Sequence, residues 1–382
     1  MARVSRGEVF DPAEVAVVHV MNRTTRRCFL LGKDPLTGKN FDHRKQWIED
    51  RLRLLAGWFG IDLLCQAILS NHFHLVLRSR PDVVAEWDDT EVAKRWMMLC
   101  PKRKDDEGKA KEPTESELNS IRLNPDKLKD IRRRLSDISW WMRLLSQNIA
   151  QRANREEGEV GKFWQARFRG VRLVDETAIL ACAAYIDLNP IRATLAETLE
   201  DSHFTSVQKR IRDLQRKQCL AHDRPTDRHD SAAVADSTRL EKDHATSAAD
   251  RSPSEAGDES GYLAPLELNE RTSKPGSSRH QHSRRCSDKG FLPMTMADYL
   301  DLLNWTISQM HTKRPDSPPA SAVPIFERLQ INANVWLRLV KDFGRLFSVM
   351  AGQPRAIDGC RSRDGSRRFR ARRKARELMS AV

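Results

Sequence analysis

Two histidines separated by a single residue could supply a metal ion with two ligands. His72 and His74 lie within the apolar stretch 70–77. Residues two apart on a β-strand point to the same face, so the two imidazoles would lie side by side, with Phe73 in the opposite layer. The spacing by itself also fits two surface histidines. A strand beneath the pair is what favours a metal site.

The chain holds a second pair with the same spacing. His280 and His282 lie in a polar run rich in Ser and Arg, with no alternation of apolar residues that would hold the rings. Only the first pair, His72 and His74, lies on a predicted strand.

Tyr185 and Asn189 form a second constellation. They are four residues apart on a predicted helix, so a phenol and an amide would project from the same face. Pro190 then ends or bends that helix. A phenol can attack phosphorus once the negative charge of its phenolate form is stabilised. A tyrosine on a helix is, however, more often a core or rim residue, so the pair gains meaning only from its context.

The apolar pattern predicts an α+β domain that would position these residues. Strands are expected at 15–21, 61–69, 72–80 and 163–174. Helices are expected at 42–58, from 138 to the glycines at 158 and 161, and after an N-cap at Asp175, with 178–185 as the body of this last helix. The order β-α-β-β-α-β followed by a helix is typical of the ferredoxin-like split βαβ fold. We expect an antiparallel sheet with helices on one face.

The predicted organisation has four parts. Residues 1–210 form the sheet domain, with a charged insertion at about 86–136 that is exposed to solvent over 101–117. Residues 211–288 read as a disordered linker, because they hold few large apolar side chains. Residues 289–355 form a small helical region, and residues 356–382 a basic tail.

Composition points to a polyanionic partner. The 382 residues carry a net charge of +13, and so basic a surface attracts phosphate backbones. Basicity does not choose between DNA and RNA. Seven scattered cysteines without a Cys-x-x-Cys pair argue against a zinc ribbon and a disulfide framework. We expect a cytoplasmic, nucleoid-associated protein with no membrane partner.

Three motifs together resemble a known family. Residues 71–74, 163–168 and 185–193 occur in the order found in HUH single-tyrosine transposases, and they look most like the REP-associated tyrosine transposase branch. The resemblance covers about residues 10–210. It implies an HUH nuclease domain that cuts and rejoins single-stranded DNA through a covalent 5′-phosphotyrosine at hairpin-forming repeats.

The resemblance also implies residue roles. Tyr185 would be the nucleophile, and His72, His74 and Asn189 would hold a divalent metal, Mg²⁺ or Mn²⁺, which neutralises phosphate charge. Relatives in the broader group carry Gln in place of Asn189, so this shorter side chain reaches the metal only if its helix sits closer. Arginines expected to bind DNA and to stabilise the phenolate are Arg23, Arg26, Arg27, Arg167, Arg169 and Arg192.

Two other functions are compatible with the sequence. A non-catalytic nucleic-acid-binding protein on a ferredoxin-like sheet would present aromatic residues on its central strands. A hydrolytic metallonuclease would need carboxylates near the histidines. Asp187 is the nearby candidate, but it would lie about 200° around the helix from Tyr185 and so should not share its face. The oligomeric state, a homodimer included, is left open, as is whether Tyr185 serves its own chain's site or a partner's.

Overall fold

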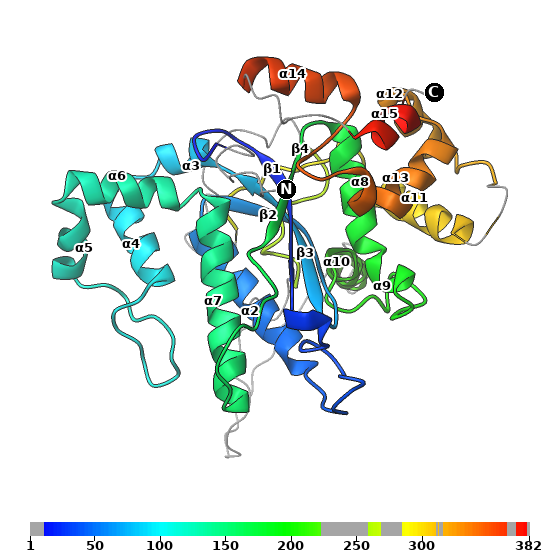
Figure 1. The fold of residues 1–382 in the computed structure, drawn as a ribbon. Helices are drawn as coiled ribbons and strands as arrows, with labels where there is room; N and C mark the ends of the chain where they lie inside the picture. Colours follow the sequence, from blue (N-terminus) through cyan, green and yellow to red (C-terminus); the bar gives the residue numbers. More distant parts are fainter. Residues whose placement is uncertain are drawn as a thin grey trace, which may run out of the picture.

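The computed structural model describes residues 11–222, 259–268, 285–310, 312, 316–364 and 372–379. The chain is a mixed α+β protein built on a five-stranded sheet of order β2-β3-β1-β4-β5 (Figure 1). The strands are β1 (Val17–Arg23), β2 (Ile61–Ile68), β3 (His72–Ser79), β4 (Arg169–Leu173) and β5 (Met350–Ala351). The first four pair antiparallel, but β5 joins β4 in parallel, so the sheet is not wholly antiparallel as expected.

β4 begins six residues later than its apolar pattern predicts, at Arg169 instead of Phe163. The residues before it cross the end of β1, where Thr24 and Trp164 form an isolated bridge. Phe163 is buried there in the core on the α7 side of the sheet. The alternation in this segment therefore reflects burial at a strand end and not a longer strand.

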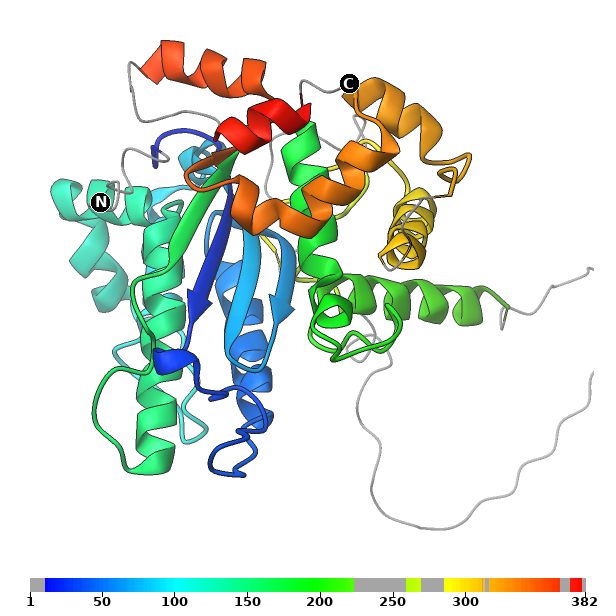
Figure 2. The ribbon, with the colours of Figure 1, turned by 45° about the vertical axis from the view of Figure 1, so that its right-hand side comes forward.

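Helices cover both faces of the sheet, so the expectation of helices on one face is wrong. α2 (His43–Trp58) and α7 (Ile138–Glu157) lie on one side, whereas α8 (Glu176–Asp187), α10 (Ser206–His222) and α13 (Ala333–Leu346) lie on the other (Figure 2). Every residue of β2 is buried, and so are all residues of β3 except its first. A sheet whose strands are buried on both faces needs a layer of structure on each.

The insertion after β3 folds into its own small group of helices. α3 (Pro81–Ala85), α4 (Asp89–Leu99), α5 (Glu115–Arg122) and α6 (Pro125–Arg134) bury Val92, Ile121 and Ile131 against the core on the α2 and α7 side. The charged loop 101–114 between α4 and α5 is mostly exposed. The solvent exposure expected over 101–117 therefore agrees with the structure, and the helices around this loop pack on the core.

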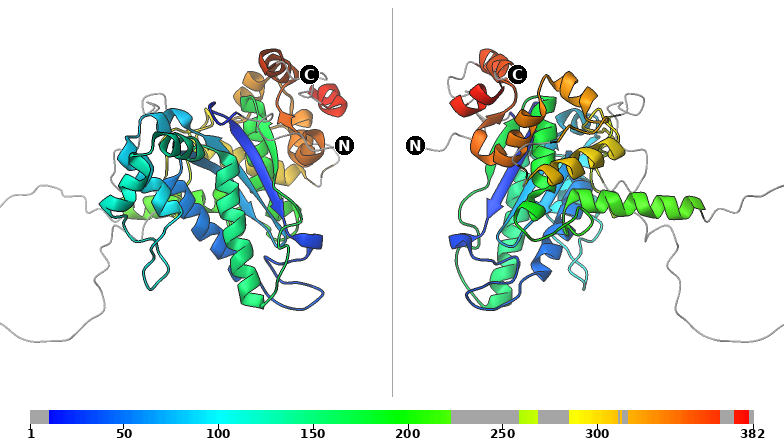
Figure 3. Two further views of the ribbon diagram at one scale, coloured as in Figure 1. Left: turned by 60° about the vertical axis from the view of Figure 1, so that its left-hand side comes forward. Right: turned by 90° about the vertical axis from the view of Figure 1, so that its right-hand side faces the viewer.

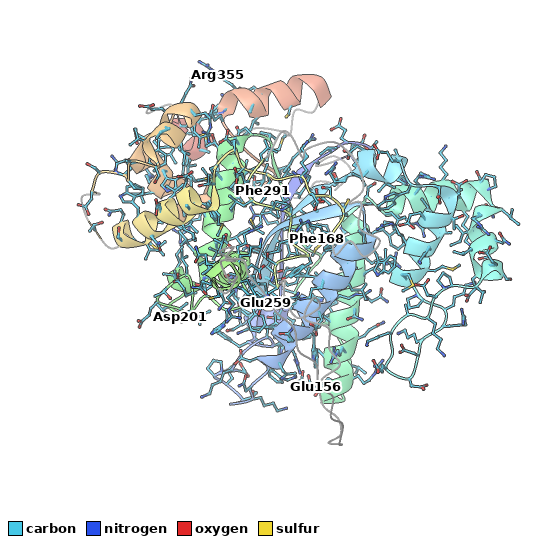
Figure 4. All side chains as sticks on the ribbon, turned by 180° about the vertical axis from the view of Figure 1, so that it is seen from behind. Glu156, Phe168, Asp201, Glu259, Phe291 and Arg355 are labelled. Carbon is cyan, nitrogen blue, oxygen red and sulfur yellow. The ribbon has the colours of Figure 1, made fainter. Side chains whose placement is uncertain are left out.

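Part of the predicted linker is packed. Tyr262, Leu263 and Cys286 are buried, and Leu263 forms a parallel bridge with Leu63 of β2. The guanidinium of Arg78 donates to the carbonyl oxygens of Lys289 and Gly290, just before Phe291, which Figure 4 labels. The linker assignment is therefore wrong for residues 259–268 and 285–288, because a few apolar residues suffice to cover β2. It is wrong for residues 211–222 as well, because they belong to α10, where Ile211 is buried. Residues 223–258 and 269–284, with His280 and His282, lie outside the described residues.

The C-terminal helices are joined to the same sheet. α11 (Met296–Gln309), α12 (Val323–Leu329) and α13 precede β5, and α14 (Pro354–Asp364) and α15 (Arg373–Met379) follow it, within the stretch predicted as a basic tail (Figure 3). α13 packs on α8. This contact brings the C-terminal region over one face of the sheet. No helix in the described part of the chain has both the length and the apolar character to cross a bilayer.

Candidate active site

The histidine pair opens the central strand β3. His72 lies opposite Arg23 of β1, and His74 lies opposite Met21. The centroids of the two imidazole rings are 5.0 Å apart. Phe73 points to the other side of the sheet, where its ring meets Trp164 edge-on at 5.5 Å. The pair therefore occupies one face of the strand, as the spacing predicts.

A third imidazole joins the pair from β1. His19 Nε2 lies 2.8 Å from His74 Nδ1, and the two rings stack with centroids 5.1 Å apart. His72 Nδ1 lies 2.6 Å from Asn71 Oδ1. When both Nδ1 atoms carry the proton, both Nε2 atoms present lone pairs, which is how hydrogen bonds from outside a metal site orient its histidines. His74 Nε2 is buried and has no hydrogen-bond partner among the described residues.

Sequence reasoning missed His19. Its one available signal is a polar ring in the middle of the apolar stretch 15–21. Such a histidine reads as a core residue until the register of β1 on β3 is known. The diagonal placement of His19 beside His74 follows from that register.

Burial keeps the three imidazoles neutral. It lowers the pKa of His72 to about 4 and that of His19 to about 3, with Arg23 and Arg169 respectively acting in the same direction. The pKa of His74 is held well below its ordinary value, first by burial and then by the neighbouring His19 and His72. A neutral imidazole is the form that binds a cation.

Tyr185 projects from α8 onto the histidine face. The helix starts at Asp175, whose carboxylate accepts from the backbone N–H of Ala178, as the N-cap pattern predicts. The half-buried Tyr185 ring meets His74 edge-on with centroids 5.5 Å apart, and His19 at 6.1 Å. The predicted nucleophile and the two predicted histidine ligands are thus brought together within one chain.

Three of the predicted arginines surround the phenol. The guanidinium carbon of Arg192 lies 4.9 Å from the centroid of the Tyr185 ring. Burial raises the pKa of Tyr185, while the charges of Arg192, Arg169 and Arg23 oppose that rise. The arginines act in the expected direction, yet burial outweighs them, so the phenol is protonated at neutral pH.

Tyr185 and Asn189 lie on two helices and not on one. α8 ends at Asp187, and the short α9 (Asn189–Arg192) begins with Asn189. Pro190 has no backbone N–H to continue α8, which explains the break. Asn189 Nδ2 is buried without a hydrogen-bond partner among the described residues. The amide turned over would present Oδ1, a metal-ligating atom, in the same direction.

The other predicted arginines lie farther out. Arg26 and Arg27 are exposed on the turn η1 (Thr25–Arg27) with left-handed φ values of 48° and 62°, which are uncommon outside glycine. Asn71 Nδ2 donates to the carbonyl oxygen of Arg27 and ties this turn to the start of β3. Arg167 is exposed just before β4. These three arginines border the site without lining it.

α13 closes the space in front of Tyr185. Phe343 stacks on the Tyr185 ring, and a Cβ added at Gly344 would lie 3.4 Å from the phenol oxygen. Arg169 and Arg192 donate to the carbonyl oxygens of Phe347 and Lys341. The cavity that remains is about 30 Å³, room for about one water molecule. No feature of the sequence indicated that α13 would pack here.

Asp187 does not belong to the site. It is fully buried and accepts from Ser206 Oγ at 2.7 Å, from Tyr299 Oη at 2.8 Å and from the backbone N–H of Val207. Its carboxylate therefore joins α8 to α10 and α11. Within the described residues, no three His, Cys, Asp or Glu side chains are grouped to hold a metal ion. A metal at the histidine pair would need an amide or solvent to complete its ligands.

Comparison with known proteins gives one coarse relation. No family model matches the chain, and no curated protein matches it. Among solved structures, a REP-associated tyrosine transposase bound to a REP hairpin is similar at 13% identity and a TM-score of 0.33, covering 63% of this chain and all of that one. At this TM-score the likeness carries no argument about the site.

Proposed function

We propose that this protein is a transposase-type enzyme that cleaves and rejoins single-stranded DNA through a covalent 5′-phosphotyrosine. The observation that carries the proposal is the edge contact at 5.5 Å between the ring of Tyr185 and that of His74, whose Nε2 atom is buried and without a partner among the described residues. A nucleophile beside unpartnered metal-ligand atoms suits metal-assisted phosphoryl transfer to a protein side chain. The order β2-β3-β1-β4 and its antiparallel pairings support a ferredoxin-like core.

In the proposed cleavage, the oxygen of Tyr185 attacks a backbone phosphorus and loses its proton to solvent. The P–O3′ bond breaks, and the departing 3′ oxygen takes up a proton. The new bond joins tyrosine to the 5′ phosphate of the downstream strand. Because the phosphodiester energy is retained in that bond, attack by a 3′-hydroxyl in the reverse direction rejoins the strands without ATP.

His72, His74 and Asn189 would hold a divalent metal, Mg²⁺ or Mn²⁺. Their donor atoms are two imidazole nitrogens and one amide oxygen, a mixed set compatible with either ion. Such a metal would supply positive charge to the phosphate oxygens. The neutral imidazoles and the unpartnered Nε2 of His74 support the two histidine ligands. The amide of Asn189, turned over, would offer Oδ1 as the third ligand atom.

Buried arginine atoms support a phosphate as the group bound beside Tyr185. Arg23 Nε and Arg192 Nη1 are buried and have no hydrogen-bond partner among the described residues. Charged N–H donors of this kind form strong hydrogen bonds with phosphate oxygens. We therefore assign Arg23 and Arg192 to the scissile phosphate, and the exposed Arg26, Arg27 and Arg167 to the flanking backbone of a single-stranded or hairpin DNA.

Catalysis in this account requires α13 to move. A cavity of about 30 Å³ is too small for a phosphodiester. Displacement of Phe343 and Gly344 would open the face of Tyr185 that lies next to the histidines. The structure thus corresponds to a closed state of the proposed enzyme.

The closed cavity is also what a non-catalytic nucleic-acid-binding protein would have, which makes that function the second candidate. The two are separated by incubating the protein and Mn²⁺ with a single-stranded DNA library of randomised sequence. A covalent adduct on a denaturing gel, absent from Tyr185→Phe, is the result expected of the enzyme. If wild type and Phe343→Ala, which removes the contact of α13 with Tyr185, both bound DNA without forming an adduct, the second candidate would be favoured.

A further inference from the structure

A second concave site lies on the far face of β1 from Tyr185. This α7 cleft, between α7 and residues 164–168, has a volume of about 590 Å³. Asn22 lines the cleft, whereas its neighbour Met21 lines the cavity at Tyr185. Adjacent residues of a strand point to opposite faces. The cleft and the candidate active site therefore share one end of β1 and open on its two sides.

The walls of the α7 cleft are held in place. Trp164 Nε1 donates to the carbonyl oxygen of Ser146 at 2.8 Å, and Asn22 Nδ2 donates to the hydroxyl of the same serine at 3.1 Å. The guanidinium carbon of Arg143 lies 4.7 Å from the centroid of the Trp140 ring. A ligand that enters such a preorganised site loses little affinity to ordering its walls.

The chemistry of the cleft matches a nucleobase. Trp140, Trp164 and Phe168 supply aromatic surface, and the side-chain amides of Asn22 and Gln147 supply hydrogen-bond donors and acceptors. Bases stack on such side chains in proteins that bind single strands. The volume is ample for one base with its sugar.

The charge of the cleft favours a strand of nucleic acid over a neutral ligand. Arg143 and Arg167 both line it, and none of the described residues that line it is acidic. Guanidinium groups bind phosphates and stack on bases. An anionic, partly aromatic ligand satisfies both parts of the lining.

One short segment connects the cleft with the candidate active site. Ala166, Arg167 and Phe168 line the α7 cleft, and the next residue, Arg169, lines the cavity at Tyr185. A strand that crosses this segment would meet Arg167 and Arg169 in turn. The two sites are therefore placed to bind one continuous DNA strand.

We propose that the α7 cleft binds an unpaired base of the DNA strand whose backbone runs over residues 166–169 to Tyr185. The route to Tyr185 rests on the proposed function, whereas binding of a base in the cleft does not. The proposal gives the segment 163–168 a role in substrate binding. It also predicts that affinity for single strands depends on bases and not only on phosphates.

The test compares two fluorescent strands of about 12 nucleotides that carry the same phosphates. One is oligothymidylate, and the other is abasic throughout. Anisotropy titrations on wild type should show tighter binding of the strand with bases by about tenfold. The double variant Arg143→Ala/Gln147→Ala should reduce this ratio to about twofold or less, because both side chains line the cleft and are exposed, so the fold should be retained.

Arg155→Ala is the matched control, since it removes one exposed arginine farther along α7. It should weaken both strands equally and keep their ratio. Equal affinity of wild type for the two strands would overturn the proposal, and so would an unchanged ratio in the double variant. Adduct formation is measured separately. A base-dependent ratio without any adduct would refute the proposed enzyme and leave the cleft assignment standing. An adduct with equal affinity for the two strands would refute the cleft assignment and leave the proposed enzyme standing.

Discussion

The ring of Tyr185 stacks on the ring of Phe343, with centroids 5.6 Å apart and planes inclined by 28°. The contact joins α8, which carries the proposed nucleophile, to α13, which covers it. Gly344 lies beside the same ring, where an added Cβ would be 3.4 Å from the phenol oxygen. The state of the candidate active site therefore depends on a helix far along the chain.

Phe343→Ala should increase the rate of adduct formation. An aromatic pair of this geometry is worth about 1 kcal/mol, so its loss shifts the equilibrium between closed and open α13 by about fivefold. Initial rates with a randomised single-stranded library and Mn²⁺ measure the effect. Phe326→Ala is the control, because Phe326 packs on Trp305 and Trp336 and not on Tyr185. A slower rate for Phe343→Ala, or equal changes in both variants, would contradict the closure of the site by α13.

His19→Leu should weaken metal binding without removing a proposed ligand. His19 Nε2 is bonded to His74 Nδ1, and loss of a group that orients a ligand typically lowers metal affinity about 10- to 100-fold. His72→Ala should abolish binding. Mn²⁺ titrations followed by electron paramagnetic resonance report the affinity without any substrate. His43→Leu, at a histidine bonded to Glu156 near the far end of α7 (Figure 4), should bind like wild type. Unchanged affinity in His19→Leu would show that His19 does not orient His74.

Asp187→Ala should destabilise the fold. The carboxylate accepts from Ser206, Val207 and Tyr299, and its removal leaves these buried donors unsatisfied at a cost of about 3 kcal/mol or more. Asp187→Asn keeps an acceptor and should cost less. Urea unfolding measures both. A loss below about 1 kcal/mol in Asp187→Ala would contradict a structural role and return Asp187 to the list of candidate catalytic carboxylates.

The same carboxyl predicts a pH dependence. Burial raises the pKa of Asp187 above its ordinary value in the folded protein. The folded state therefore holds this proton more tightly than the unfolded state, so stability is gained as pH falls through the raised pKa and lost as pH rises through it. The free energy of unfolding of wild type should increase relative to Asp187→Asn as pH is lowered from neutral toward the ordinary carboxyl range. A difference that shrinks as pH falls would contradict the raised pKa.

Local patterns predicted three of the strands and the start of α8 well. The alternation and apolar runs around His74 placed β1, β2 and β3 to within about two residues, and Asp175 begins α8 as its capping pattern indicates. The shared face of His72 and His74 follows directly from strand geometry. These features depend on neighbours in sequence, which is why the sequence was sufficient for them.

Long-range packing decided what the sequence could not predict. His19 reaches His74 only through the register of β1 on β3, and Phe343 reaches Tyr185 across more than a hundred residues of chain. Tyr262 begins the short apolar run 262–266 inside a largely polar stretch, and its contacts with the sheet bury it. No local pattern records such contacts, so the closed state and the third imidazole emerged only from the fold.

The central claim is that Tyr185 forms a bond to the 5′ phosphate of a cleaved strand. The direct measurement uses a single-stranded library labelled at the 3′ end or at the 5′ end, with wild type, Phe343→Ala and Tyr185→Phe compared on denaturing gels. The account predicts that wild type and Phe343→Ala retain the 3′ label, that the 5′ label is released, and that Tyr185→Phe forms no adduct. An adduct with Tyr185→Phe, retention of the 5′ label, or no adduct from either of the other two proteins would contradict it.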